Sequence, residues 1–120
     1  MKNDRQSICF INCAIEAYGD RWSLIIIRDM AFYEKRTFGE FLKSPEGIST
    51  NILANRLLHL ESSGLIDKRK CSDDGRAYIY SLTNKGESVK PILEKMMVWG
   101  KESSLNKYNE HKSITVKHKD

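Results

Sequence analysis

One face of a predicted helix carries short hydrogen-bonding side chains where a helix in solvent would usually carry Glu and Lys. The helix lies in the stretch GISTNILANRLLHLESSGLI, residues 47–66, and its inner face is a stripe of leucines. A turn of about 100° per residue from Leu53 places Asn51 and Asn55 near the opposite pole. Amides can pair with adenine through two hydrogen bonds, and hydroxyls can bond to several base edges. The chemistry available to this face is therefore the reading of DNA bases, and the alternative is a plain amide-rich surface helix.

The residues of this helix that are expected to contact DNA stand at its start and along its outer face. They are Ser49, Thr50, Asn51, Asn55 and His59. Ser49 is also the expected N-cap, and Gly64 is expected just after the C-terminal end. Acidic side chains would be repelled by phosphate, and the first acid in the helix is Glu61, near its end. For His59, a position facing the groove and a merely solvated position both remain open.

A charged hairpin is predicted directly after this helix. The segments LIDKRKC and AYIYSLT have the composition of two strands, and Asp74-Gly75 between them is a strong turn signal. The basic residues of the hairpin are Lys68, Arg69, Lys70 and Arg76. At the tip of such a wing, Arg76 would reach a phosphate or enter the adjacent minor groove. A solvated charged hairpin is the plain alternative, but the place of the hairpin after the candidate recognition helix favours DNA contact.

Other elements must hold the candidate recognition helix and the hairpin in position. Apolar residues at helical spacing predict a helix over residues 5–18. The segment RWSLIIIRDMAF fits either a buried strand or a helix buried nearly all round, and periodicity alone leaves both open. Thr37, with Glu40 three residues later, predicts a capped short helix in TFGEFLKS. The last helix is expected to open at Asn84 and to run to about residue 104.

The order of elements is therefore helix, helix, short helix, capped helix, hairpin and helix. A helix–turn–helix followed at once by a hairpin predicts a mainly α (α+β) fold of the winged helix-turn-helix type. In such a module the second helix of the pair lies in the major groove of DNA. We expect one domain over residues 1–104, which includes the dimerisation helices, and a flexible polar tail over residues 105–120.

The first and last predicted helices carry more apolar side chains than a core of this size is expected to absorb. The surplus consists of Ile8, Ile11, Ile15, Ile92, Met96 and Trp99. A surplus of this kind marks an association surface. We therefore predict that the N- and C-terminal helices form the interface of a homodimer.

Composition excludes several classes of protein. The chain has 120 residues, 40% of them hydrophobic, which suits one modest core, and its net charge of +4 is weak support for an anionic partner. No apolar run approaches the ~18 residues that span a bilayer, and the start lacks a secretory signal, so a cytoplasmic protein without membrane contact is expected. A phosphate loop and a nucleophile elbow are both missing, so we expect neither an enzyme nor a cofactor. The residues His59, His111 and His118 do not complete a zinc site, so no metal is expected.

The three cysteines, Cys9, Cys13 and Cys71, are an odd number without the spacing of a disulfide framework. They are predicted to be reduced thiols. Cys9 and Cys13 stand four residues apart on one helix, a spacing that does not suit a disulfide within the helix, whereas a bond between subunits stays open. A free cysteine on a helix is commonly just a small apolar side chain, so packing is the alternative to a redox role.

Three segments together resemble the HxlR-type winged-helix transcriptional regulators. They are CAIEAYGDRWSLIIIRDM, RTFGEFLKSPEGISTNILANRLLHLESSGLI and YSLTNKGESVKPILEKMMVWG, and the likeness covers about residues 9–101. The positions that match the opening of the family pattern are Cys13, Glu16, Gly19 and Arg21-Trp22. The usual Pro of the family after the first Cys is Ala14 here, and its second turn Gly is Asp20. The wing CSDDGRA resembles those of a subset of the family and of MarR-type regulators, which makes the DNA contacts of the wing less transferable.

The resemblance implies a homodimeric DNA-binding regulator whose first and last helices build the dimer. It also implies that the helix after GIS enters the groove, and that SLIII is helical. Several relatives are described as using a cysteine at the position of Cys13 to sense oxidants or electrophiles. A redox role for Cys13 is carried over on that ground alone.

The expected function is sequence-specific regulation of transcription by a homodimer bound to double-stranded DNA, at an inverted-repeat operator, with an oxidant or small-molecule effector left open. The alternative is a winged-helix module that binds other proteins and no DNA. Binding to DNA would weaken steeply with salt because counterions are released from phosphate, whereas an apolar protein interface would respond little. A thiol enzyme is a third reading, which would require turnover of a small electrophile.

Overall fold

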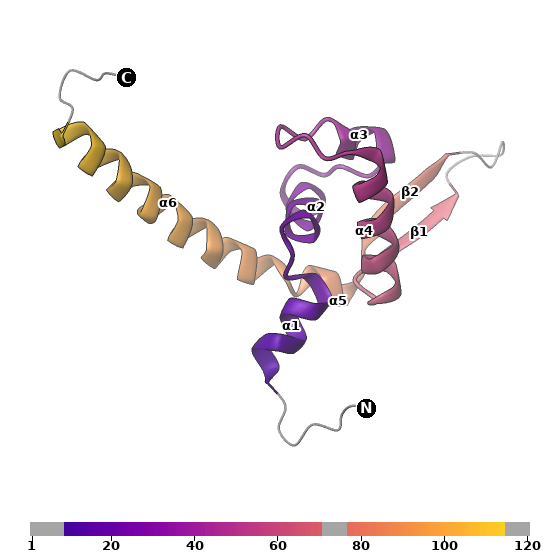
Figure 1. Cartoon of the computed structure of the whole chain (residues 1–120). Coiled ribbons are helices and arrows are strands. Elements are labelled where there is room, and N and C mark those ends of the chain that lie inside the picture. Colours follow the sequence, from indigo (N-terminus) through magenta and orange to yellow (C-terminus); the bar gives the residue numbers. More distant parts are fainter. Residues whose placement is uncertain (1–8, 71–76, 115–120) are drawn as a thin grey trace. The chain divides into compact units, whose positions relative to one another are not determined.

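The computed structural model describes residues 9–70 and 77–114, with side chains described as far as residue 105. The chain divides after Ser88 into two units, which are described separately. The first unit contains α1 (Phe10–Tyr18), α2 (Arg21–Phe32), α3 (Phe38–Leu42), α4 (Thr50–Ser62), β1 (Ile66–Lys70), β2 (Tyr78–Leu82) and α5 (Asn84–Glu87) (Figure 1). The second contains α6 (Lys90–Ile114).

Two of the predicted helix starts are confirmed by their hydrogen bonds. Thr37 and Glu40 form a capping box at α3, in which the Thr37 hydroxyl accepts from the Glu40 N–H and the Glu40 carboxylate accepts from the Thr37 N–H. Ser49 caps α4 by accepting from the N–H of Ile52 at 3.2 Å. A cap of this kind contributes about 1 kcal/mol, so the start of α4 is set by local chemistry.

The end of α4 is also local in origin. Gly64 adopts φ +80°, a left-handed conformation that residues with a side chain rarely take. The N–H of Gly64 then donates to the Glu61 carbonyl, and that of Leu65 donates to the Leu60 carbonyl, each at 3.0 Å. This pair of bonds is the Schellman motif, and it turns the chain directly into β1.

The core of the first unit is built by α2, α3, α4 and the hairpin. Ile26, Ile27 and Met30 of α2 are buried, so the SLIII segment forms a helix, as the resemblance implies. The leucines of the predicted inner stripe of α4, at positions 53, 57 and 60, are all buried as well. Each such side chain contributes about 1.5–3 kcal/mol on burial, which fixes the face that α4 turns inward.

The predicted hairpin forms an antiparallel pair of strands in which Ile66 stands opposite Leu82 and Lys70 opposite Tyr78. Tyr80 of β2 links it to α3 and to the segment before α3. The N–H of Tyr80 donates to the Arg36 carbonyl at 2.9 Å, and the Tyr80 ring meets Phe41 edge-on with 6.2 Å between centroids. In Figure 1 the two strands run beside α4. The predicted Asp74-Gly75 turn lies outside the described residues.

The C-terminal helix differs from the prediction at both ends. The helix expected to open at Asn84 ends after Glu87, and α6 begins separately at Lys90. The reason is Pro91, which has no N–H to donate to the Glu87 carbonyl but is well tolerated in the first turn of a new helix. The helix also continues to Ile114, into the span predicted to be a polar tail, since no Gly or Pro interrupts that stretch. None of the helices described is long and apolar enough to cross a membrane.

Candidate nucleic-acid interface

The outer face of α4 presents the predicted polar residues to solvent. Thr50, Asn51 and Asn55 are exposed, while Leu53, on the opposite side of the helix, is completely buried. Ser49 is exposed too, although its oxygen serves as the cap of the helix. The first two turns of α4 therefore offer hydroxyl and amide groups and no carboxylate.

The structure brings His59 to a place that the sequence did not indicate. Its Nε2 lies 3.0 Å from the carbonyl oxygens of both Glu16 and Ala17, near the end of α1. Because carbonyls only accept, Nε2 carries the proton and the ring donates to the last turn of α1. Neither the groove-facing nor the merely solvated position predicted for His59 describes this contact, and its role is to join α4 to α1.

Arg56 is a residue of this surface that the sequence did not single out. Its Nε and one terminal nitrogen donate to Oδ1 of Asn55 at 3.0 and 2.7 Å. The other terminal nitrogen pairs at 3.0 Å with the carboxylate of Asp20, the N-cap of α2. The signal that could have suggested this link was an arginine beside a candidate reading residue, together with an acid predicted at a helix start.

The carboxylate of Asp20 is held in its charged form. Partial burial would raise the pKa of this group, but hydrogen bonds from Ser23 and the ion pair with Arg56 outweigh burial and lower it. Asp20 therefore stays ionised near neutral pH and can anchor Arg56.

A second ionic network holds the turn between α3 and α4. Arg28 donates to Asp29 at 2.7 Å and to both oxygens of Glu46 at 2.7 and 3.0 Å. Asp29 is 1% exposed and also accepts from Lys35 and from the hydroxyl of Ser44. The hydrogen bonds from Arg28 lower the pKa of Glu46 to about 2. Because Glu46 lies three residues before the Ser49 cap, the network fixes the chain where it enters α4.

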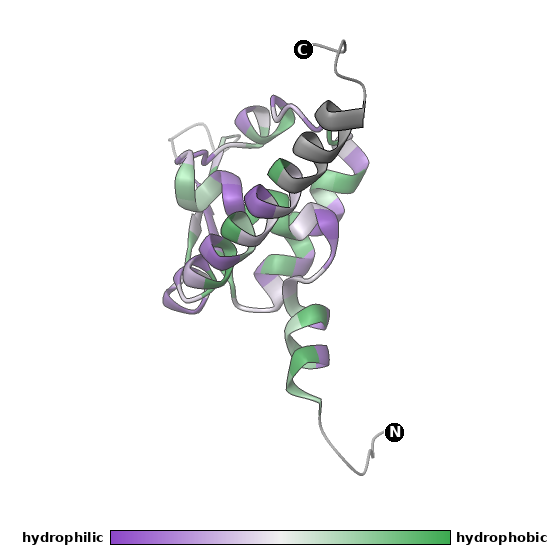
Figure 2. Ribbon diagram, turned by 90° about the vertical axis from the view of Figure 1, so that its left-hand side faces the viewer, coloured by the Kyte–Doolittle hydropathy of each residue, from purple (hydrophilic) through white to green (hydrophobic). Residues whose placement is uncertain are grey.

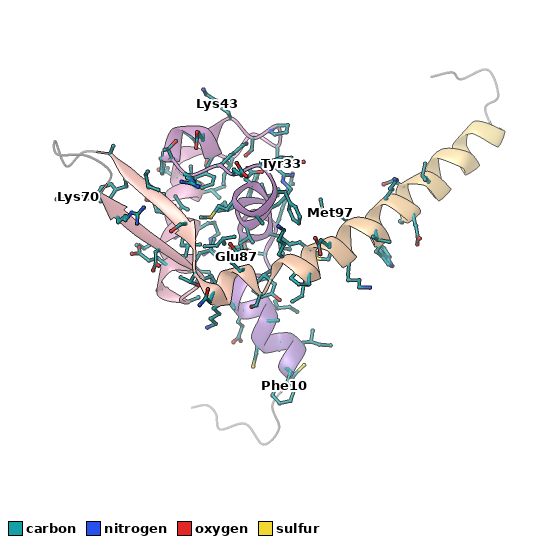
Figure 3. The ribbon with its side chains drawn as sticks, turned by 180° about the vertical axis from the view of Figure 1, so that it is seen from behind. Phe10, Tyr33, Lys43, Lys70, Glu87 and Met97 are labelled. Carbon is teal, nitrogen blue, oxygen red and sulfur yellow. The ribbon has the colours of Figure 1, made fainter. Side chains whose placement is uncertain are left out.

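The described part of the hairpin carries three exposed basic residues on β1, Lys68, Arg69 and Lys70. The ammonium of Lys68 lies 4.3 Å from the centroid of the Tyr78 ring, so this side chain rests across the strand. Figure 3 labels Lys70 near the end of the strand. Arg69 and Lys70 form no ion pair with any residue whose side chain the structure describes. Arg76 lies outside the described residues.

Apolar side chains predicted for a dimer surface are exposed on both terminal helices. On α1, Ile11 is 73% and Ile15 is 54% exposed, and Figure 2 colours most of this helix green for hydrophobic. On α6, Trp99 is 72% exposed, and Ile92 and Met96 are exposed as well. Ile8 lies outside the described residues. Each helix thus presents an apolar surface of its own.

The two described cysteines are both free and exposed. The sulfur of Cys9 stands at the N-cap of α1 and accepts the N–H of Asn12 at 3.4 Å. Cys13 is in the first turn of the helix that follows. Its exposure does not fit the alternative in which the side chain only fills a packed core, while Cys71 lies outside the described residues.

The helix pair α3–α4, followed at once by a two-stranded antiparallel hairpin, defines a winged helix-turn-helix protein. The model of the HxlR-like helix-turn-helix family matches residues 17–108. The chain belongs to this family, whose members are transcriptional regulators and not enzymes. Among the residues whose side chains are described, no group of His, Cys, Asp and Glu is placed to hold a metal ion.

Known proteins resemble the chain in sequence and in fold. An uncharacterized HTH-type transcriptional regulator of Mycobacterium tuberculosis is 36% identical over 89 residues, which cover 74% of this chain and 55% of that protein. The chain therefore matches only about half the length of this relative. The crystal structure of PA1607, a proposed transcription factor, gives a TM-score of 0.72 at 37% identity over 81% of this chain and 66% of the other. The structure of the redox regulator HypR in its oxidized form gives a TM-score of 0.70 at 25% identity. The match covers 78% of this chain and 96% of the HypR chain.

Proposed function

We propose that the protein regulates transcription by binding double-stranded DNA as a homodimer, with α4 in the major groove. The observation that supports this best is the outer face of α4, where Thr50, Asn51 and Asn55 are exposed and uncharged at the start of the helix. In helix-turn-helix proteins this part of the second helix contacts base edges. The exposed charges of Arg69 and Lys70 would lie against the phosphate backbone, which attracts basic side chains irrespective of sequence.

Selection of bound DNA from random sequence tests this proposal. We expect enrichment of inverted repeats, because a two-fold symmetric dimer reads two half-sites. Replacing Asn55 with alanine should weaken binding to the preferred site by about 1–3 kcal/mol and relax the preference at one position of each half-site. Ser62→Ala, an exposed change in the last turn of α4, is the matched control and should leave the selected sequence unchanged.

The alternative function, a module that binds other proteins and no DNA, predicts a different result in this selection. If the chain is a module that binds proteins alone, random DNA gives no enriched sequence, and any residual binding lacks the steep fall with salt that counterion release causes. An unchanged consensus in Asn55→Ala would instead show that DNA is bound through another face.

We propose that the exposed apolar side chains of α1 and α6 pair two copies of the chain. Ile11, Ile15 and Trp99 are each more than half exposed. Exposed apolar surface of this kind on a helix marks a site of association. An inverted-repeat operator would follow from such pairing, since a two-fold dimer presents one α4 to each half-site.

At micromolar concentration the protein is therefore expected to sediment as a dimer. Trp99→Glu should shift it to the monomer, because burying an unpaired carboxylate in an apolar interface is costly. Tyr33→Glu changes a ring that is 59% exposed but lies at the end of α2, and it should leave the dimer intact. A monomeric wild-type protein under the same conditions would contradict the proposed dimer.

We propose further that an exposed thiol couples DNA binding to oxidants. Cys13 is exposed on α1, which we assign to the dimer surface, and HypR is a redox regulator at 25% identity. Peroxide would oxidise the Cys13 thiolate to a sulfenic acid with release of water, and a second thiol could then form a disulfide. Either product would change the packing between subunits and the spacing of the two α4 helices.

Mild peroxide treatment is expected to lower operator affinity by tenfold or more, since base contacts weaken steeply when their geometry is disturbed, and tenfold is about 1.4 kcal/mol. Cys13→Ser should abolish this response and keep the affinity of the reduced protein. A response that persists in Cys13→Ser would move the sensing role to Cys9 or Cys71. Titration of the operator with protein before and after treatment measures the two affinities. If peroxide leaves the affinity of the wild type unchanged, the proposal that the protein responds to peroxide is wrong.

A further inference from the structure

The amide of Asn55 is fixed in one orientation by its neighbour. Arg56 places two donors, Nε and a terminal nitrogen, at 3.0 and 2.7 Å from the Asn55 Oδ1. A guanidinium has donors and no acceptor, so the atom that faces it must be the amide oxygen. The amide nitrogen of Asn55, with its two N–H groups, is then the part left free to meet a ligand.

The oxygen of this amide is already engaged by a cation. Two N–H groups of the cationic Arg56 guanidinium point at this oxygen, and hydrogen bonds from a charged donor are roughly twice as strong as neutral ones. The usual pairing of asparagine with adenine requires the amide to accept from adenine N6 while it donates to N7. In the arrangement described here, the Asn55 amide donates freely, whereas a donor on a base would have to compete with Arg56 for the amide oxygen.

Arg56 is itself held at its far end. Its remaining terminal nitrogen pairs with Asp20 at 3.0 Å, and the lowered pKa of Asp20 keeps that carboxylate charged. The side chain of Arg56 is only 25% exposed. The guanidinium thus spans from the start of α2 to the outer face of α4, and its contact with Asn55 is pre-organised.

We infer that Arg56 is a positioning residue that makes Asn55 a donor-only reader of DNA, and so selects a base edge that presents acceptors alone. Guanine fits best, because its N7 and O6 are both acceptors in the major groove, whereas adenine adds a donor at N6. This inference rests on the proposed binding of DNA through α4. It replaces the adenine pairing that the sequence alone suggested for this amide.

The test is selection from random DNA with the full chain, in wild type, Asn55→Ala and Arg56→Met. The position that loses its preference in Asn55→Ala is the one that Asn55 reads. At that position the wild type should select guanine over adenine. Arg56→Met keeps a long side chain but removes every donor, so the freed amide oxygen should shift the preference toward adenine by about tenfold, the scale of one good bidentate contact.

Two further variants separate positioning from folding. Arg56→Lys keeps a donor for Oδ1 and should retain the preference for guanine, even if Arg56→Met is too unstable to assay. Asp20→Asn keeps an N-cap side chain on α2 while it removes the charge that anchors Arg56, and it should weaken the preference without reversing it. Unfolding temperatures of all variants show which of them are folded.

Each outcome is informative. Adenine at the Asn55 position in the wild type, or guanine kept at full strength in folded Arg56→Met, would overturn the inference while leaving DNA binding intact. A uniform loss of affinity in Arg56→Met without a change of preference would assign Arg56 to phosphate, and would also overturn it. If the wild type enriches no sequence at all, the proposed function itself is refuted, and the inference with it.

Discussion

Replacement of Gly86 with alanine is expected to lower the free energy of unfolding by about 3 kcal/mol, the upper part of the usual range for an overpacked core. A Cβ at this position would stand 2.1 Å from the carbonyl oxygen of Leu65 and 2.9 Å from a methyl carbon of Leu82. The first of these atoms is backbone, so a rotamer change cannot relieve the contact.

The close approach at Gly86 has a structural cause. Thr83 ties α5 to the end of α4, because its N–H donates to Leu65 O at 3.0 Å and its hydroxyl donates to Gly64 O at 2.7 Å. The same hydroxyl caps α5 by accepting from the N–H of Gly86. An added methyl group would therefore push α5 away from the hairpin and break these bonds.

Urea unfolding measures the effect, and Gly39→Ala is the matched control. Gly39 is also in a short helix, α3, but an added Cβ there meets nothing within 4 Å. Alanine at that position should be neutral or stabilising by up to about 1 kcal/mol, because it reduces the entropy of the unfolded chain. Equal effects of the two substitutions would show that α5 does not pack against Leu65 as described.

The second large effect is expected at Asp29. Asp29→Ala should lower the free energy of unfolding by about 3 kcal/mol, because removal of one partner leaves the others of a buried network without their counter-charge. The carboxylate is 1% exposed, whereas the Arg28 and Lys35 side chains are 22% and 20% exposed. Partial access of these cations to water places the expected loss at the lower end of the range for buried ion pairs.

Glu46→Gln provides the comparison within the same network. Glu46 also pairs with Arg28, but its side chain is 25% exposed. Water can therefore solvate Arg28 when the charge of Glu46 is replaced by a neutral amide. Glu46→Gln should lower the free energy of unfolding by less than about 1 kcal/mol. If both substitutions cost equally little in thermal and urea unfolding, the network is not what holds the entry to α4.

Local signals in the sequence were sufficient for most of the secondary structure. The caps at Thr37 and Ser49 and the terminator at Gly64 act within a few residues, so each can be read without knowledge of the fold. The break between α5 and α6 does not follow from the apolar periodicity, which continues across it, and Pro91 is the residue that signals it.

The arrangement of the candidate site could not be predicted in the same way. His59 meets carbonyl groups 42 and 43 residues earlier, and Arg56 meets a carboxylate 36 residues earlier. Contacts of that separation depend on how α1 and the start of α2 pack on α4, which no local pattern encodes. The exposure of Asn55 could be predicted from helical geometry, whereas the hydrogen bonds from Arg56 to its amide oxygen could not.

The first helix has a consequence for the timing of subunit exchange. Within Phe10–Tyr18, all of which the structure describes, no side chain is buried, and a nine-residue helix is only marginally stable by itself in water. In the proposed dimer, the free energy that orders α1 would come from the partner subunit, so dissociation and unravelling of α1 would be one event. Amide protons of α1 would then exchange with solvent at a rate that falls as protein concentration rises. A modification of Cys13, which is carried on the same helix, would act on the same equilibrium.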